Sequence, residues 1–407
     1  MPEHDRATVL GWQSTILGIA KEEMGHLITV QNILRLVGGP LNFRREDFPW
    51  DSDITPFPFT LEPVSTEVLA NYIVAESPTD WGSAATPEEK GEIEAAATAS
   101  AGREVKPVGV LYAYMIALLR EKSIVPDSVF LADTLPYQAS WDEWGRAYGG
   151  PVEAPQQGTR PDLLIGTGYS RDKAVAALQQ VADQGEAPSE DYDIGETSHF
   201  AKFLAVWRGF KAMNPVPVRP LAVNPIVPFD PDLPALSSRG LAAALAEKAP
   251  LTEIRDPIAA KWGLVCNLRY QILLNYLSHS LSLSGPELAQ PPQNPRGLLV
   301  HNTFGEMYNL RALSSILVQL PMGGADISLR AGPPFQMPYS LSLPADEPAR
   351  WHVHLDLLQG AAGVIEALLQ TAAGTQRSYL LTLQAADTET MVAIRTILDP
   401  CRQSRRR

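Results

Sequence analysis

The sequence predicts an all-α protein, a helical bundle with irregular crossovers followed by a second helical half. Long segments carry apolar residues at spacings of three and four, and glycine and proline punctuate them. A short strand is considered only for residues 378–383, and the predicted fold class does not depend on it. A chain of 407 residues exceeds one ordinary domain. We therefore expect a helical domain at 1–213, a proline-rich strap at 214–234 and a second helical domain at 235–407.

The first half is expected to contain helices joined by irregular segments. The longest covers residues 8–37, where Gly38-Gly39-Pro40 stops it. Residues 41–63 are rich in proline and read as a crossover of the kind a bundle with non-sequential neighbours needs. Glycines and prolines at 141–161 predict a loop. The other expected helices are 65–75, 86–99, 107–122, 171–184 and 193–212.

Seven prolines between residues 214 and 234 forbid a helix and favour extended backbone, so this segment is the expected boundary. The second half again has helical periodicity. A tight loop is expected at Gly332-Pro333-Pro334-Phe335. The expected helices of this half are 237–247, 256–283, 295–320, 345–373 and 387–398.

Charge and hydropathy restrict the classes of partner. The net charge of −13 and the pI of about 5.1 argue against nucleic acid or a membrane surface as partner. No uncharged apolar run reaches the roughly 18 residues that span a bilayer, and the N-terminus has no signal-peptide pattern. The two cysteines form no CxxC motif. A cytoplasmic protein with a small-molecule substrate fits these features.

A Glu-x-x-His pair interrupts the apolar stripe of the first helix. Glu23 and His26 lie in the middle of a row with spacings of three and four, so they should face a partner helix. A buried unpaired carboxylate costs several kcal/mol, so the burial must be compensated. The other members of the row are Ile16, Ile19, Val30, Ile33 and Val37.

The same construction appears once more at Glu196 and His199, between Tyr192 and Phe203. Two buried pairs on two helices of one bundle are typical of carboxylate-bridged di-iron or di-manganese sites. Carboxylate with neutral imidazole suits Fe, Mn or Zn. The alternative is a metal-free remnant in which glutamate and histidine hydrogen-bond each other across the bundle.

Three groups of motifs match a known family: Glu22-Glu23-Met24-Gly25-His26-Leu27 with Gly38-Gly39-Pro40, Asp183-Gln184-Gly185-Glu186 with Ser198-His199-Phe200, and Leu320-Pro321-Met322-Gly323 with Ala331-Gly332-Pro333-Pro334-Phe335. In these stretches the chain resembles the ferritin-like domain of iminophenylpyruvate dimer synthases, enzymes of violacein and related bisindole biosynthesis. The resemblance implies a ferritin-like bundle holding iron, di-iron or mononuclear, with manganese or zinc as alternatives. It also implies an oxidoreductase acting on an amino-acid-derived imine or another secondary-metabolite intermediate. Some relatives are haem enzymes, so haem is a further alternative.

The chain also departs from the family pattern. A preceding helix that would supply another glutamate is missing, and Val110 stands where an acid is expected. Glu186, which closes a helix, is the candidate replacement ligand. One alternative is that the start of the sequence is truncated, and a second is that another subunit of a homo-oligomer supplies the missing carboxylate. A third is that the site is reduced to one metal or none. Another is a non-catalytic ferritin-like scaffold or partner subunit with a degenerate metal site.

Overall fold

The computed structural model describes residues 3–144, 165–186, 197–213, 218–228, 252–284, 294–337 and 341–399. Regular structure in these parts is almost entirely α-helical, so the expected all-α class is confirmed. The strands β1 (Pro225–Ile226) and β2 (Thr252–Glu253) form one short parallel pair. Among the described helices, none has the length and apolar character to cross a membrane.

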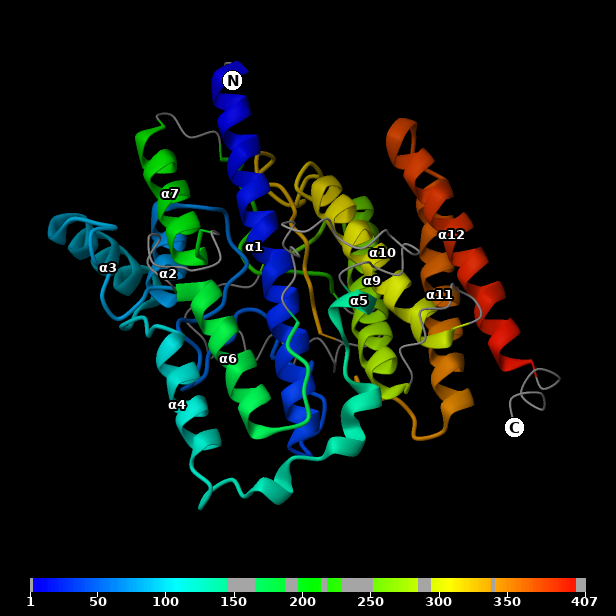
Figure 1. Ribbon diagram of the computed structural model, residues 1–407. Helices are drawn as coiled ribbons and strands as arrows, with labels where there is room; N and C mark the ends of the chain where they lie inside the picture. Colours follow the sequence, from blue (N-terminus) through cyan, green and yellow to red (C-terminus); the bar gives the residue numbers. More distant parts are fainter. Residues whose placement is uncertain are drawn as a thin grey trace.

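The longest helix, α1 (Glu3–Leu36), lies between two groups of helices (Figure 1). On one side, α2 (Thr66–Ala75) packs against α3 (Pro87–Ala101) and α7 (His199–Ala212). On the same side, α4 (Gly109–Arg120) packs against the helix of residues 171–186, which also contacts α1 and α7. Each of these helices overlaps an expected one, and the crossover of residues 41–63 contains no helix.

Side-chain caps set the starts of several helices. Ser65, Thr86 and Ser198 each accept a hydrogen bond from a backbone N–H in the first turn of α2, α3 and α7. The cap at Ser198 corrects the expectation of a helix from residue 193. The backbone at Ser198 is extended, so α7 begins at His199. Residues 197 and 198 are not helical, and Glu196 lies outside the described residues.

The second half consists of α9 (Pro257–Ser282), α10 (Pro295–Leu317), α11 (Glu347–Leu369) and α12 (Gly374–Leu398). Helix α9 packs against α10 and α11, and α11 packs against α12 (Figure 1). The strand considered at 378–383 is wrong, because these residues lie inside α12, where they follow a glycine with positive φ at the helix start. The helix expected at 237–247 lies outside the described residues.

The two halves are in direct contact. Ile28 of α1 shares a buried apolar cluster with Leu277 of α9 and Val300 of α10. Arg296 and Glu143 form a buried ion pair in the same region. Glu143 belongs to a short helix, α5 (Trp141–Trp144), at the start of the segment expected to be a loop. The boundary at 214–234 stays a prediction, although its described part, residues 218–228, contains no helix.

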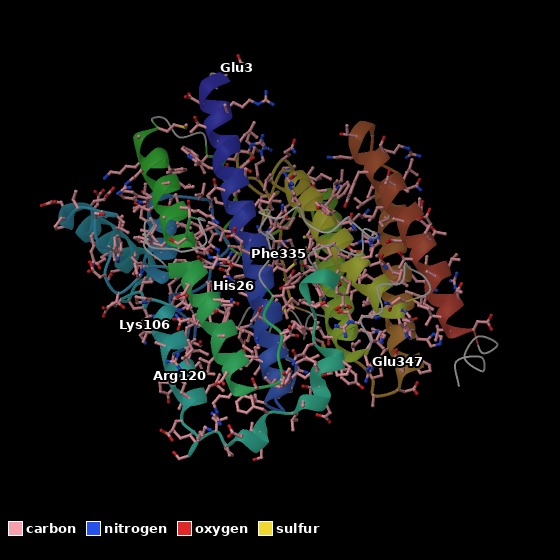
Figure 2. All side chains as sticks on the ribbon, in the orientation of Figure 1. Glu3, His26, Lys106, Arg120, Phe335 and Glu347 are labelled. Atoms are coloured by element: carbon pink, nitrogen blue, oxygen red, sulfur yellow. The ribbon has the colours of Figure 1, made fainter. Side chains whose placement is uncertain are left out.

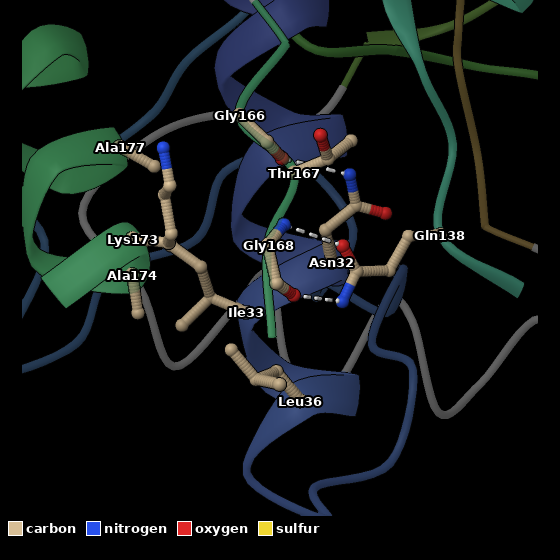
Figure 3. A pocket seen from close by; sticks show the side chains of 10 residues that line it. All are labelled: Asn32, Ile33, Leu36, Gln138, Gly166, Thr167, Gly168, Lys173, Ala174 and Ala177. Atoms are coloured by element: carbon tan, nitrogen blue, oxygen red, sulfur yellow. Dashed lines mark hydrogen bonds between the residues drawn. The ribbon is translucent and has the colours of Figure 1, made fainter. Parts of the chain in front are cut away.

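A polar contact holds α6 (Arg171–Glu186) close to α1. Asn32 of α1 donates to the carbonyl oxygen of Gly166 at 2.9 Å, and Gln138 exchanges two hydrogen bonds with the backbone of Gly168 (Figure 3). A Cβ at position 166 would overlap the Cβ of Ala177 in α6, so this close approach requires glycine. The cavity between these residues measures about 10 Å³, too small for a substrate. The contact places the last turn of α6 beside the middle of α1.

Candidate metal centre

The first ligand pair lies in the C-terminal half of α1, a helix that contacts α6 and α7; Figure 2 labels His26. The His26 ring is buried, with Nδ1 3.3 Å from Oε2 of Glu23 and Nε2 2.7 Å from Oε1 of Gln184. The Glu23 side chain is 46% exposed, so the expectation that it is buried is wrong. Its position at i, i+3 from His26 nevertheless lets its carboxylate turn inward and contact the imidazole.

His199 brings the second ring to the same place. It is the first residue of α7 and is fully buried. Its Nδ1 lies 2.9 Å from Oε1 of Glu23, and its Nε2 lies 2.8 Å from Oε2 of Glu22. The centroids of the two imidazole rings are 5.4 Å apart. One ligand atom from each of Glu23, His26 and His199 falls within 4.8 Å of the others, so these three expected site residues converge.

A further carboxylate reaches the site from α2. Glu76 is the C-cap of that helix, and its Oε2 lies 3.8 Å from Nδ1 of His199. Gly185 makes room for it, because a Cβ at that position would lie 2.9 Å from Oε2 of Glu76. Glu76 was not among the expected ligands. It continues the buried stripe of Leu69 and Ile73 at helical spacing, which is the signal that could have found it.

Two other residues near the centre had no expected role. Lys202 places its Nζ 2.8 Å and 2.6 Å from the two carboxylate oxygens of Glu22. Gln184, which holds His26, stands in the last turn of α6. Both lie within or beside motifs visible in the sequence, but their contacts join residues more than 150 positions apart and have no local signature.

The carboxylates dominate the electrostatics of the centre. Burial by itself lowers the pKa of His199, but Glu22, Glu23 and Glu76 outweigh it and raise that pKa to about 11. Burial likewise raises the pKa of Glu22, yet His199 and Lys202 outweigh it and leave that pKa below its usual range. The pKa of Glu23 is also lowered, because the two imidazoles outweigh the effect of its partial desolvation. The site therefore favours ionised carboxylates and demands positive charge.

The donor set fits a transition metal. Two imidazoles with carboxylates are the ligands that suit Fe, Mn or Zn. Nδ1 of His199 is buried and makes no hydrogen bond of good geometry, even though Oε1 of Glu23 is 2.9 Å away. A buried nitrogen surrounded by carboxylate oxygens in this way is the arrangement that a cation would complete.

The remaining expected site residues are placed as follows. Glu186 ends α6, but its side chain lies outside the described residues, as does all of Glu196. Their roles as ligands stay predictions. Val110, which stands where the family pattern led us to expect an acid, lies on α4 and is 65% exposed. The additional acid comes from α2 instead, because α2, unlike the exposed face of α4, packs on α7 beside His199.

Comparison with known proteins agrees with this arrangement. Neither the curated proteins nor the solved structures contain a match to the chain. A family model described as Ferritin-like matches residues 3–208, about half of the chain and the part that contains every residue of the centre. The more specific resemblance to iminophenylpyruvate dimer synthases has no separate support from these comparisons. The chain belongs to the ferritin-like family.

Proposed function

We propose that this protein binds a transition metal, iron in the first place, between α1, α2 and α7, and that it is an oxidoreductase. Glu23, His26 and His199 would hold the metal, with Glu76 as a further carboxylate. Glu186 and Glu196 remain candidates to complete a second metal position. The observation that carries the proposal is the convergence of two buried imidazoles on one carboxylate, from helices far apart in the chain.

The residues of the centre have separable tasks. His26 and His199 both turn Nδ1 toward Glu23, whose two oxygens lie between the rings. Gln184 and Glu22 hold the opposite nitrogen of each ring. Iron held by carboxylate and imidazole supplies electron transfer to dioxygen or peroxide when it is bound. The partly exposed Glu23 marks the side from which the centre is open to solvent.

The substrate class follows from the motifs that resemble iminophenylpyruvate dimer synthases. We propose an amino-acid-derived imine, or another secondary-metabolite intermediate, as the small molecule on which the protein acts. Iron-loaded protein incubated with an α-imino acid and with dioxygen or peroxide as oxidant should release an oxidised or coupled product detectable by mass spectrometry. A His199→Ala variant should release none, and equal product from both proteins would refute the assignment.

A second candidate function is a non-catalytic scaffold with a metal-free centre. The observation in its favour is that Lys202 and His199 already contact the carboxylates. Under this function the residues of the centre contribute only to stability. His26→Ala and His199→Ala would then lower the melting temperature without changing metal content.

Metal analysis decides between the two. The protein is reconstituted anaerobically with Fe²⁺, freed of excess metal and measured by mass spectrometry for bound Fe, Mn and Zn. We expect bound metal in the wild type and its loss in His26→Ala and His199→Ala. His301→Ala and His352→Ala are matched controls, because both histidines are exposed on helices of the second half. A metal content no higher than background in the reconstituted wild type would refute the proposed function.

A further inference from the structure

Glu22 contacts His199 on the ring nitrogen that faces away from Glu23. It precedes Glu23 on α1, and its side chain is only 13% exposed. One of its oxygens, Oε2, lies 2.8 Å from Nε2 of His199, and both oxygens contact Nζ of Lys202. His199 and Lys202 are three residues apart on α7, so they face the same carboxylate one turn apart. A single acidic side chain of α1 thus holds two consecutive turns of α7.

The contact determines which imidazole nitrogen is available to a cation. In a metal-bound imidazole, one nitrogen keeps its proton and donates it, and the other gives its lone pair to the metal. The partner of Nε2 in His199 is a carboxylate, which only accepts, so this nitrogen carries the proton. Nδ1, which has no hydrogen bond of good geometry, then faces Glu23 and Glu76.

His26 provides an internal comparison. Its Nε2 contacts the amide oxygen of Gln184 at 2.7 Å, and its Nδ1 also faces Glu23. The two rings therefore have the same orientation relative to Glu23 but differ in the charge of the outer acceptor. A charged acceptor polarises the imidazole more strongly than a neutral amide and makes its free nitrogen a stronger ligand.

We infer that Glu22 is a positioning residue that makes Nδ1 of His199 the ligating nitrogen, with Lys202 holding the Glu22 carboxylate in place. The inference rests on the proposed metal binding. It gives Glu22 no direct contact with the metal, and it distinguishes the neighbouring glutamates Glu22 and Glu23 by role.

The test measures Zn²⁺ affinity by competition with a chromophoric chelator. Loss of an outer hydrogen-bond partner typically weakens metal binding about 10–100-fold, which is the expectation for Glu22→Ala. Glu22→Gln should lie between this variant and the wild type, because its amide oxygen can accept as Gln184 does. Lys202→Met should have a smaller effect than Glu22→Ala. Glu92→Gln is the matched control. It breaks the ion pair between Glu92 of α3 and Lys211 of α7, and Glu92 does not contact His199.

A spectroscopic measurement separates positioning from simple loss of stability. In the Zn²⁺-loaded protein labelled with ¹⁵N-histidine, His199 should have a protonated Nε2 and a metal-bound Nδ1. Glu22→Ala, which leaves Nε2 without its acceptor, should change this pattern, while the His26 signals keep theirs. Metal binding through Nε2 of His199 would overturn the inference. So would affinities of both Glu22 variants within about twofold of the wild type. If the wild type binds Zn²⁺, either of these results refutes the role of Glu22 but not the proposed metal site. A wild type that does not bind Zn²⁺ would refute both the metal site and the role of Glu22.

Discussion

Acidification should destabilise the second helical half through one buried histidine. His354 of α11 is fully buried, and its Nε2 lies 2.8 Å from Nδ1 of His279 on α9. Nε2 of His279 in turn contacts Glu347 at the surface, at 3.0 Å. Nδ1 of His354 has no hydrogen-bond partner in the described part of the chain. Burial, and then the neighbouring His279, lower the pKa of His354 well below 6.5.

The sign and size of the effect follow from proton linkage. Above pH 6.5 His354 is neutral in both the folded and the unfolded chain, so it does not affect the free energy of unfolding. Below pH 6.5 the unfolded chain binds a proton that the folded protein excludes, and stability falls by about 1.4 kcal/mol per pH unit. Between pH 7.5 and pH 5.0 the loss from this group amounts to about 2 kcal/mol.

Urea unfolding of the wild type and of His354→Gln at the two pH values measures this loss. Glutamine cannot titrate, and its amide can still reach His279, so carboxylates that respond to acid contribute equally to both proteins. We expect the stability difference between wild type and variant to shift by about 2 kcal/mol against the wild type at pH 5.0. A shift below about 0.5 kcal/mol would mean that His354 titrates normally, and the argument from burial would fail.

Three other substitutions or treatments test the packing around the centre and in the second half. Arg269 is fully buried and contacts Glu306 and Asp387. Arg269→Met leaves these carboxylates unpaired, so it should lower the free energy of unfolding, measured by denaturant titration, by about 3–5 kcal/mol. A loss under about 1 kcal/mol would contradict the buried ion-pair network. Gly166→Ala should force α6 away from α1, which should lower the melting temperature and weaken metal binding. An unchanged melting temperature with unchanged metal affinity would show that this close approach is dispensable. Burial raises the pKa of the Cys266 thiol to about 12, so iodoacetamide at pH 8 should leave Cys266 unmodified until urea unfolds the chain. Rapid labelling of Cys266 in the folded protein would refute its burial.

The sequence predicts the helices of this protein well where the chain's local pattern is sufficient. Helix α1 follows from its apolar spacing and the glycines at its end, and Glu23 and His26 were identified because they interrupt that spacing. His199 lies beside Glu23 and His26 in the structure, and α7 begins at His199 rather than at the expected residue 193. A cap depends on one side-chain hydrogen bond, so the periodicity of residues 192–203 did not reveal that Ser198 begins a new helix.

Glu76 shows why the rest of the site could not be predicted from the sequence. From the sequence, Glu186 was the candidate for the additional carboxylate, whereas the structure brings Glu76 to His199 from α2. Glu76 follows a recognisable apolar stripe, but many helices end in a glutamate. Its selection depends on how α2 packs against α7, which no local pattern encodes.

The sequence by itself determined the all-α class, the long first helix with Glu23 and His26 on one face, and the candidacy of His199, because these depend on spacing along one helix. Only the tertiary structure decided that Glu22 and Glu23, neighbours in the chain, contact opposite nitrogens of His199. Adjacent residues on a helix point about 100° apart, and which of them reaches a given atom is set by the packing of α7 against α1.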